Sequence, residues 1–282
     1  EEPIEALCDR FLRATVAYWQ TWVKHCDIPA DHQDEVIRSA LALKLHCFED
    51  TGAIVAAMTT SIPESPGSGR TWDYRYCWLR DAYYTLGAFR LLGQFEEREG
   101  FLRYLVNVAA STPALDLVTR LARKAVSVAG RPDAGIWEFR TEWRPQTFSS
   151  LMCWAAADRM QRIAAAHRPA DVKEFALAVE AIRDEVLTRA VDVARGTLVA
   201  DYGGAELDAA LLQAVTLRLL APDDPRAGAT IDAVRADLSM GAWLRRYRAD
   251  DGFGAPTVAF TLCTFWLVEA LARVGRLAEK DA

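Results

Sequence analysis

The chain is 282 residues long, with 51% hydrophobic and 26% charged residues and a net charge of −6. This balance is typical of a soluble globular protein with a sizeable core, and it excludes an intrinsically disordered chain. The negative charge, with no long run of Lys or Arg to offset it, argues against nucleic acid as the main partner. No apolar run approaches the ~20 residues that a membrane-spanning helix needs, so we expect no membrane partner.

Cysteine and histidine are scattered along the chain. None of the six cysteines forms a CxxC pair, and most lie within apolar helical patterns. We therefore expect buried thiols in a reducing compartment such as the cytoplasm. The four histidines lack metal-ligand spacing, so the sequence predicts neither a metal site nor a cofactor. Nothing in the sequence indicates an oligomeric state.

Apolar residues recur with a helical period along nearly the whole chain. They mark a first helix around residues 7–19 and a second around residues 36–47. Further helical patterns cover residues 75–93, 97–110, 114–128, 147–167, 171–193, 206–220, 227–240 and 257–275. Loops rich in Gly, Pro and Asp separate these segments, with almost no strand signal. About ten helices in this order predict an all-α array of helical hairpins, and a closed barrel is favoured over a solenoid because no repeat period recurs.

The stretch WDYRYCWLRD combines aromatic rings with Arg and Asp. On a helical period, Tyr74, Trp78, Asp81 and Thr85 share one face. Burying these polar groups in a dry core costs free energy unless each has a partner, whereas rings beside carboxylate and guanidinium groups suit a sugar. The competing interpretation is an ion pair between Arg80 and Asp81 at a helix end, with the rings as core. Spacing alone leaves both interpretations open.

Trp137 directly precedes Glu138 in GRPDAGIWEFRTEW, a glycine-containing loop between two predicted helices. Loops of this kind often carry functional residues. An indole packed against a glutamate would remove water from its carboxylate and favour the protonated form, which a general acid at neutral pH requires. An exposed loop glutamate with a coincidental tryptophan neighbour explains the local sequence equally well.

A third candidate stretch, LRRYRADDGFGAPTVAFTLCTFWLVEAL, joins a charged loop to a strongly apolar helix. The loop contains Arg246 among other charged residues, and the helix is rich in Phe and Trp. By itself, this pattern favours solvated loop charges over a binding site.

Taken together, these stretches resemble glycoside hydrolase family 15, the family of glucoamylases, bacterial trehalases and related exo-acting α-glucosidases. The resemblance depends on the highly specific strings TWDYRYCWLRDAYYTLGAF and PDAGIWEFR, supported by RSALALKLHCFEDTGAIVAAMTTSIPES, FSSLMCWAAADR, LDAALL, DDPRAGATIDAV and FGAPTVAFTLCTFWLVEAL. These strings occur in the family's order over residues 5–277. The resemblance implies an all-α (α/α)6 barrel with its site at one end.

The resemblance also implies roles for individual residues. Glu138 would be the general acid. The substrate-binding residues would be Tyr74, Trp78, Arg80, Asp81, Trp137 and Arg246, with Arg80 and Asp81 on the hydroxyls of the terminal glucose. The implied activity is exo-acting, inverting hydrolysis of an α-glucoside, a small carbohydrate substrate, with release of glucose. In an inverting enzyme, a carboxylate base ~6.5–9.5 Å from the acid activates the attacking water.

The chain departs from the family in three places. The family's general base lies in a segment beyond the last predicted helix, and its N-terminal β-sandwich domain would precede Glu1. A family segment between the fourth and fifth predicted helices is also absent, which suggests omitted residues near 108–116. We therefore expect residues 1–282 to form one incomplete (α/α)6 catalytic domain. The alternatives are an inactive sugar-binding or scaffold relative without the base, and a helical-repeat interaction protein; trehalose, maltodextrin, isomaltose and dextran all remain open as substrates.

Overall fold

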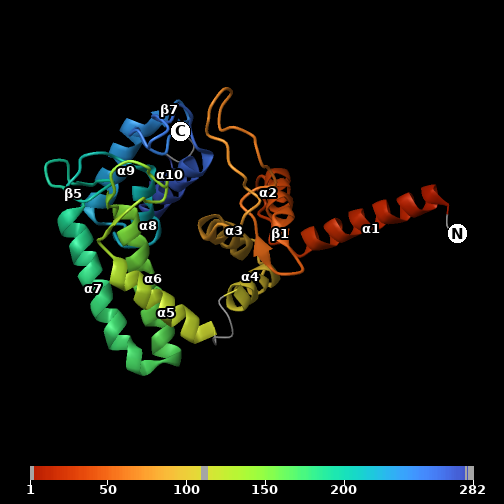
Figure 1. Cartoon of the computed structure of the whole chain (residues 1–282), viewed down its shortest axis with the longest axis horizontal. Coiled ribbons are helices and arrows are strands. Elements are labelled where there is room, and N and C mark those ends of the chain that lie inside the picture. Colours follow the sequence, from red (N-terminus) through yellow and green to blue (C-terminus); the bar gives the residue numbers. More distant parts are fainter. Residues whose placement is uncertain (1–2, 109–113, 277, 279–282) are drawn as a thin grey trace. The chain divides into compact units, whose positions relative to one another are not determined.

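The structure is a computed structural model that describes residues 3–108, 114–276 and 278 (Figure 1). The chain divides into two compact units, Glu1–Ala114 and Leu115–Ala282, called unit 1 and unit 2 below. Helices dominate both units, and every strand within the described residues is two residues long.

Unit 1 contains helices α1 to α4 and one small hairpin in its described part. The elements are α1 (Ile4–Lys24), α2 (Gln33–Leu45), β1 (Cys47–Phe48), β2 (Ala53–Ile54), α3 (Leu79–Leu91) and α4 (Glu96–Val108), and β1 pairs antiparallel with β2. Ile54, Ala82 and Phe101 are buried together, so the hairpin, α3 and α4 share one small core. The hairpin turns at Gly52 with φ of +82°, and a Cβ added there would lie 2.2 Å from the Gly100 carbonyl oxygen. Glycine is therefore required at this turn both by its conformation and by the close backbone approach.

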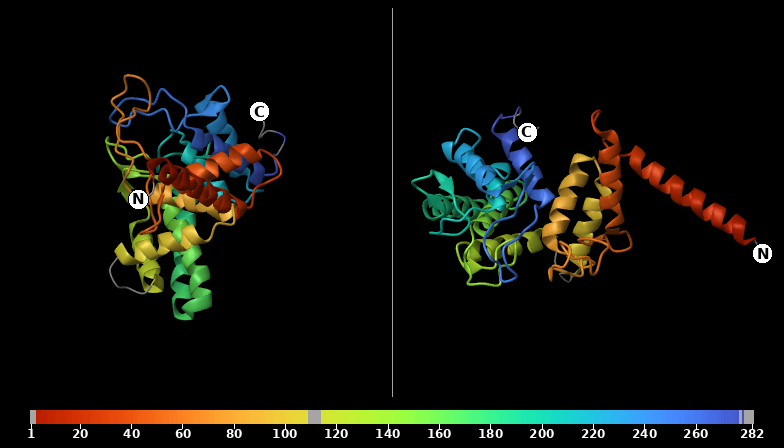
Figure 2. Two further views of the ribbon diagram at one scale, coloured as in Figure 1. Left: turned by 90° about the vertical axis from the view of Figure 1, so that its right-hand side faces the viewer. Right: turned by 90° about the horizontal axis from the view of Figure 1, so that it is seen from above.

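Helix α1 has an apolar side that its own unit does not cover. None of its residues is buried, and Ile4, Phe11 and Leu12 are among its exposed apolar side chains. Figures 1 and 2 both show α1 extending away from the other helices of unit 1.

A buried polar network joins the C-terminal half of α1 to α2 and α4. Lys44 of α2 has a side chain that is 9% exposed, and its Nζ lies 3.1 Å from Oε1 of Glu97 and 2.6 Å from Oε1 of Glu49. The Glu97 side chain is 5% exposed, and its Oε1 also accepts the indole N–H of Trp22 at 2.8 Å. Tyr18 donates its hydroxyl to Glu49. The buried carboxylate of Glu97 is thus matched by one cation and one neutral donor.

Unit 2 holds the remaining helices and three further hairpins. Its helices are α5 (Ala114–Val128, whose first residue belongs to unit 1), α6 (Thr147–His167), α7 (Val172–Arg189), α8 (Gln213–Thr216), α9 (Pro225–Leu238) and α10 (Thr261–Arg273), with 3-10 turns η1 (Pro169–Asp171) and η2 (Ala209–Leu212). Its antiparallel strand pairs are β3 (Pro132–Asp133) with β4 (Arg144–Pro145), β5 (Val191–Asp192) with β6 (Thr197–Leu198), and β7 (Ser239–Met240) with β8 (Trp243–Leu244). Helices α6 and α7, joined by η1, lie side by side as a helical hairpin (Figures 1 and 2). Leu151, Met160 and Phe175 are among the buried residues between the elements of this unit.

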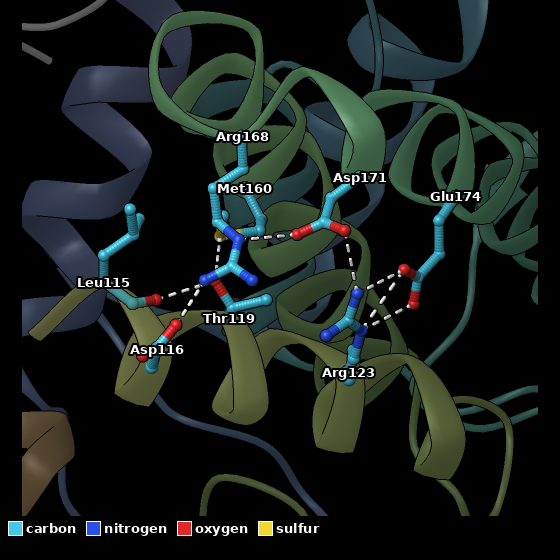
Figure 3. Close-up of polar contacts among 8 residues, drawn as sticks. All are labelled: Leu115, Asp116, Thr119, Arg123, Met160, Arg168, Asp171 and Glu174. Carbon is cyan, nitrogen blue, oxygen red and sulfur yellow. Dashed lines mark hydrogen bonds and ion pairs between the residues drawn. The ribbon is translucent and has the colours of Figure 1, made fainter. Parts of the chain in front are cut away.

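Ion pairs connect α5 to the turn between α6 and α7 (Figure 3). Arg168 forms ion pairs with Asp116 of α5 and, through Nε at 2.8 Å, with Asp171 of η1. Arg123 of α5 reaches Asp171 at 3.1 Å and Glu174 of α7 at 2.7 Å. Asp171 therefore lies between two guanidinium groups from different elements. Because the arginines are partly exposed, we expect this network to orient α5 more than it stabilises the unit.

Most of the predicted helices are confirmed. The pattern at 147–167 coincides with α6, the pattern at 114–128 coincides with α5, and all but one of the others lie within a few residues of observed helices. The single helix predicted at 206–220 is wrong: this segment contains η2 and the one-turn helix α8. Residues 209–217 are all buried, and an apolar run that is buried on every side has no period from which a regular helix can be inferred.

The structure bears to different degrees on the expectations for the cysteines, the omitted segment, the domain count and the absence of a membrane span. The six cysteines are free thiols, but the expected burial is complete only for Cys263. Cys8 is exposed on α1, and the other four are partly buried. The predicted omission near 108–116 falls largely on residues 109–113, which lie outside the described residues. The expectation of one domain over 1–282 stays a prediction. Within the described residues, we find no helix whose length and apolarity suffice to span a membrane.

Candidate functional site

Four predicted substrate-binding residues lie together at the N-terminal end of α3 in unit 1. Tyr74 and Trp78 have ring centroids 5.6 Å apart in an edge-to-face arrangement. Arg80 Nε lies 3.3 Å from Asp81 Oδ2, and both side chains are about one-third exposed (35% and 34%). The ion pair that we considered as the competing interpretation is therefore present. Both side chains are only partly buried, although the Oδ2 atom of Asp81 is itself covered.

The predicted common helical face of these residues is wrong. Helix α3 begins at Leu79, with Trp78 as its N-cap residue in an extended conformation. Tyr74 lies before the helix, where its carbonyl accepts the N–H of Ala57 and its own N–H donates to Thr59, both at 2.9 Å. These backbone bonds hold the Tyr74 segment against the chain that follows β2, so the aromatic pair arises from a turn rather than from helical spacing.

Glu138 lies in the loop between β3 and β4 of unit 2. Asp133 Oδ1 accepts the N–H of Gly135 at 2.7 Å and the hydroxyl of Ser149 at 2.6 Å, which fixes the start of the loop. Phe139 N–H then donates to the Ala134 carbonyl at 2.8 Å and closes a tight turn. Within this turn, Glu138 is exposed and has φ of +59°, a left-handed conformation that is unfavourable for a residue with a Cβ. Such local strain is characteristic of functional positions held by their surroundings.

The indole of Trp137 packs into an aromatic group that we call the Trp137 cluster. The cluster consists of Trp137, Arg246, Tyr247, Phe260 and Trp266. The ring centroids of the other three aromatic residues lie 5.9 to 6.1 Å from that of Trp137. The Arg246 guanidinium lies 5.7 to 5.8 Å from the ring centroids of Trp137, Tyr247 and Phe260, within the range of cation–π attraction.

This packing decides between the two interpretations of the loop that the sequence left open. The indole of Trp137 packs into the Trp137 cluster, and Glu138 is exposed, so within unit 2 the structure agrees with an exposed loop glutamate rather than one covered by the indole.

Asp208 is the buried carboxylate beneath the Trp137 cluster. It is 6% exposed and caps η2, with Oδ1 accepting the N–H of Ala210 at 2.6 Å. Its Oδ2 accepts the indole N–H of Trp137 at 2.7 Å. Loss of water on burial raises the pKa of Asp208 to about 7, against the opposing effects of these two donors and of the Arg246 charge.

A second buried aspartate holds the other side of the same loop. Asp251 is 3% exposed, and its Oδ2 accepts the hydroxyl of Tyr247 at 2.5 Å. The backbone carbonyl of Asp251 accepts the N–H of Arg140 at 2.9 Å. The Tyr247 ring packs on Phe139 with centroids 4.9 Å apart. The residues on both sides of Glu138 are therefore fixed to one other segment of unit 2.

The structure thus brings together Tyr74, Trp78, Arg80 and Asp81 in unit 1, and Trp137, Glu138 and Arg246 in unit 2. The predicted meeting of the two groups in one pocket stays a prediction. Within the described ranges, no group of three or more His, Cys, Asp or Glu side chains is arranged to hold a metal ion.

Sequence reasoning assigned no role to Asp208 or Asp251. Asp208 stands in the apolar string LDAALL, where a carboxylate surrounded by Leu and Ala needs dedicated partners. That was the available signal, but the sequence does not show that the partner is an indole 71 positions earlier in the chain.

Comparisons with known proteins assign the chain to a family. The sequence profile described as "Glycosyl hydrolases family 15" matches residues 30–129 and 121–279. A trehalase of Mycolicibacterium smegmatis is 31% identical over an alignment covering 97% of this chain and 52% of the relative. A trehalase of Thermoplasma acidophilum is 29% identical, with 94% and 57% covered. The chain therefore spans about half the length of these relatives.

Solved structures show the same fold. A bacterial glucoamylase complexed with acarbose has a TM-score of 0.71 at 14% identity, over 99% of this chain and 53% of that one. A wild-type glycosidase has a TM-score of 0.61 at 20% identity, over 86% and 79%. The likeness confirms the predicted fold class, all-α and of the (α/α)6 type. By its sequence profile and its fold, the chain belongs to glycosyl hydrolases family 15.

Proposed function

We propose that the protein is an exo-acting, inverting α-glucoside hydrolase, with Glu138 as the general acid. The observation that carries this proposal is the exposed Glu138 carboxylate, held in a left-handed turn beside the Trp137 cluster in a chain of family 15. A general acid must present its proton to a bound substrate while its position is fixed by neighbours. The turn around Glu138 meets both requirements.

The other site residues bind the sugar. Arg80 and Asp81 are partly exposed and can exchange hydrogen bonds with the hydroxyls of a terminal glucose, beside the edge-to-face rings of Tyr74 and Trp78. Arg246 and Trp137 bind the sugar next to the acid, since a guanidinium and an aromatic surface suit its hydroxyl and C–H groups respectively.

The reaction breaks one bond and forms another at the anomeric carbon. Glu138 donates its proton to the glycosidic oxygen as the bond from that oxygen to the anomeric carbon breaks. Water adds to the anomeric carbon from the opposite face, so an α-glucoside yields β-glucose. The proton lost by the water passes to a carboxylate base, a role that we assign to no described residue.

The relatives narrow the substrate class. The M. smegmatis and T. acidophilum proteins carry the name trehalase, and the solved glucoamylase is complexed with acarbose. These names support a glucoside with an α-glycosidic bond, and they make trehalose the first substrate to test. The six free cysteines support the cytoplasm, a reducing compartment, as the place of action.

The decisive experiment measures glucose release by the wild-type chain from trehalose, maltose and isomaltose, with early NMR spectra to identify the first anomer. We expect β-glucose, and initial formation of α-glucose would contradict inversion. Glu138→Gln should lower kcat by about 10²–10⁴-fold with sugar binding retained. The matched control is Glu142→Gln, because Glu142 lies in the same loop and its side chain is 83% exposed. Equal losses in the two variants would reject Glu138 as the acid, and glucose binding without any turnover would favour a sugar-binding relative.

A further inference from the structure

Asp208 uses its two carboxylate oxygens for two different tasks. Oδ1 caps η2 through the Ala210 N–H at 2.6 Å, and Oδ2 accepts the Trp137 indole N–H at 2.7 Å. The side chain is 6% exposed, so it lies beneath the aromatic surface rather than at it. A cap alone does not require the second bond. Asp224 caps α9 through the Arg226 N–H at 3.0 Å and pairs with the Arg226 side chain instead.

The hydrogen bond to Trp137 acts on the adjacent residue. Glu138 follows Trp137 directly and has φ of +59°, so small rotations of the indole are transmitted to a backbone that is already strained. On the C-terminal side of Glu138, the turn is held by two contacts. The Phe139 ring packs against Tyr247, and the Arg140 N–H donates to the Asp251 carbonyl. On the N-terminal side of Glu138, the hydrogen bond from Trp137 to Asp208 holds the turn in the same way.

We propose that Asp208 is a positioning residue for Glu138: by accepting the indole N–H of Trp137, it fixes the turn that presents the acid to substrate. This inference rests on the proposed function of Glu138. Asp208 itself touches neither substrate nor the reacting atoms. It joins η2, an element without a part in the proposed chemistry, to the geometry of the acid.

The protonation state of Asp208 should also change the strength of its hydrogen bond with Trp137. Burial raises the pKa of Asp208 to about 7, while the Ala210 and Trp137 donors and the Arg246 guanidinium act in the opposite direction. The thiol of Cys263 on α10 also lies near enough for the Asp208 charge to raise its pKa further, beyond the larger effect of burial. A carboxylate accepts a stronger hydrogen bond than a carboxylic acid does. The hold on Trp137 should therefore weaken as the pH falls through about 7.

A double-mutant cycle between Asp208→Asn and Trp137→Phe tests the link through catalysis. Asn keeps the size of the side chain but replaces one acceptor oxygen with a donor group, and Phe removes the indole N–H. We expect Asp208→Asn to lower kcat by about 10–100-fold with little change in KM, since a misplaced catalytic group costs that much. In the Trp137→Phe background, the same substitution should change kcat by less than about threefold, because coupled residues are not additive. Asp224→Asn, which alters a cap without an indole, should leave kcat unchanged.

A measurement that does not use activity separates this inference from the proposed function. The ¹H–¹⁵N signal of the Trp137 indole, identified by its loss in Trp137→Phe, should titrate with a midpoint near 7 in the wild-type chain. Asp208→Asn should abolish that titration. A signal that ignores both pH and the substitution, or fully additive effects on kcat, would overturn the inference even in an active enzyme. A titrating signal in a chain that hydrolyses no glucoside would instead support the Asp208–Trp137 link and refute the proposed function. The wild-type titration keeps the test valid even if Asp208→Asn does not fold.

Discussion

Replacing Lys44 with Met tests the buried polar network of unit 1. The substitution keeps most of the apolar stem and removes the charge that lies 3.1 Å from Glu97 Oε1. Glu97 would then keep its carboxylate in a site where its side chain is 5% exposed, with the Trp22 indole N–H still donating to it. Removing one partner of a buried ion pair typically costs about 3–5 kcal/mol, because the other charge loses its compensation. The lost contact with Glu49, which is 57% exposed, adds less than about 1 kcal/mol.

The double variant Lys44→Met, Glu97→Gln separates this mechanism from a simple packing defect. Gln is uncharged and can still accept the Trp22 indole N–H, so the double variant should be more stable than Lys44→Met alone. Lys24→Met, at an exposed position on α1, is the matched control and should cost less than about 1 kcal/mol. Urea unfolding followed by far-UV circular dichroism gives the free energies, and hydrogen exchange in α2 and α4 localises the loss. A cost below about 1 kcal/mol for Lys44→Met, or a double variant less stable than the single one, would refute the reasoning.

Three further predictions concern stability. Gly52→Ala should destabilise the protein by about 2 kcal/mol or more, because φ is +82° and the new Cβ would lie 2.2 Å from the Gly100 carbonyl oxygen. A free energy of urea unfolding equal to that of the wild type would contradict this. Asp208 has a folded pKa of about 7, above its ordinary value of 3.8, so its contribution to stability is present below about pH 4 and is lost as the pH rises through 7. The stability of the wild type relative to Asp208→Asn should therefore fall by up to about 4 kcal/mol between pH 4 and 8, and a pH-independent difference in urea unfolding would be evidence against this. Arg123→Ala should lower the free energy of unfolding by less than about 1 kcal/mol, because the Arg123 side chain that pairs with Asp171 is 43% exposed. This loss should be smaller in 1 M salt, which screens the ion pair. A loss above about 2 kcal/mol in thermal or urea unfolding would contradict this prediction.

The sequence was sufficient to predict the bounds of α5 and α6. Helix α5 has buried and exposed residues along its length, as an amphipathic helix does, whereas α6 has no exposed residue before Arg159. The pattern failed where long-range backbone bonds decide the structure. The Tyr74 segment reads as part of a helix, but its bonds to Ala57 and Thr59 hold it in a turn.

The candidate site divides in the same way. Trp137 and Glu138 were recognisable because they are adjacent in a glycine-containing loop within a specific string. Asp208 was not recognisable, because its role depends on a hydrogen bond to a residue 71 positions away. A single sequence does not reveal that contact. The left-handed conformation of Glu138 was equally hidden, since glutamate has no preference for it.

The anchors of the Glu138 turn also bear on the order in which the protein is made. The partners described above that hold the turn from outside lie later in the chain: Asp208 by 70 positions, then Tyr247 and Asp251 by more than 100. A growing chain that has just emerged through Glu138 therefore contains the acid without the residues that fix it. Domains gain their long-range contacts late because loop closure costs entropy before those contacts form. The acid turn should accordingly reach its final geometry only after synthesis has passed the β7–β8 hairpin, so ribosome-bound chains shorter than this would carry Glu138 without a formed site.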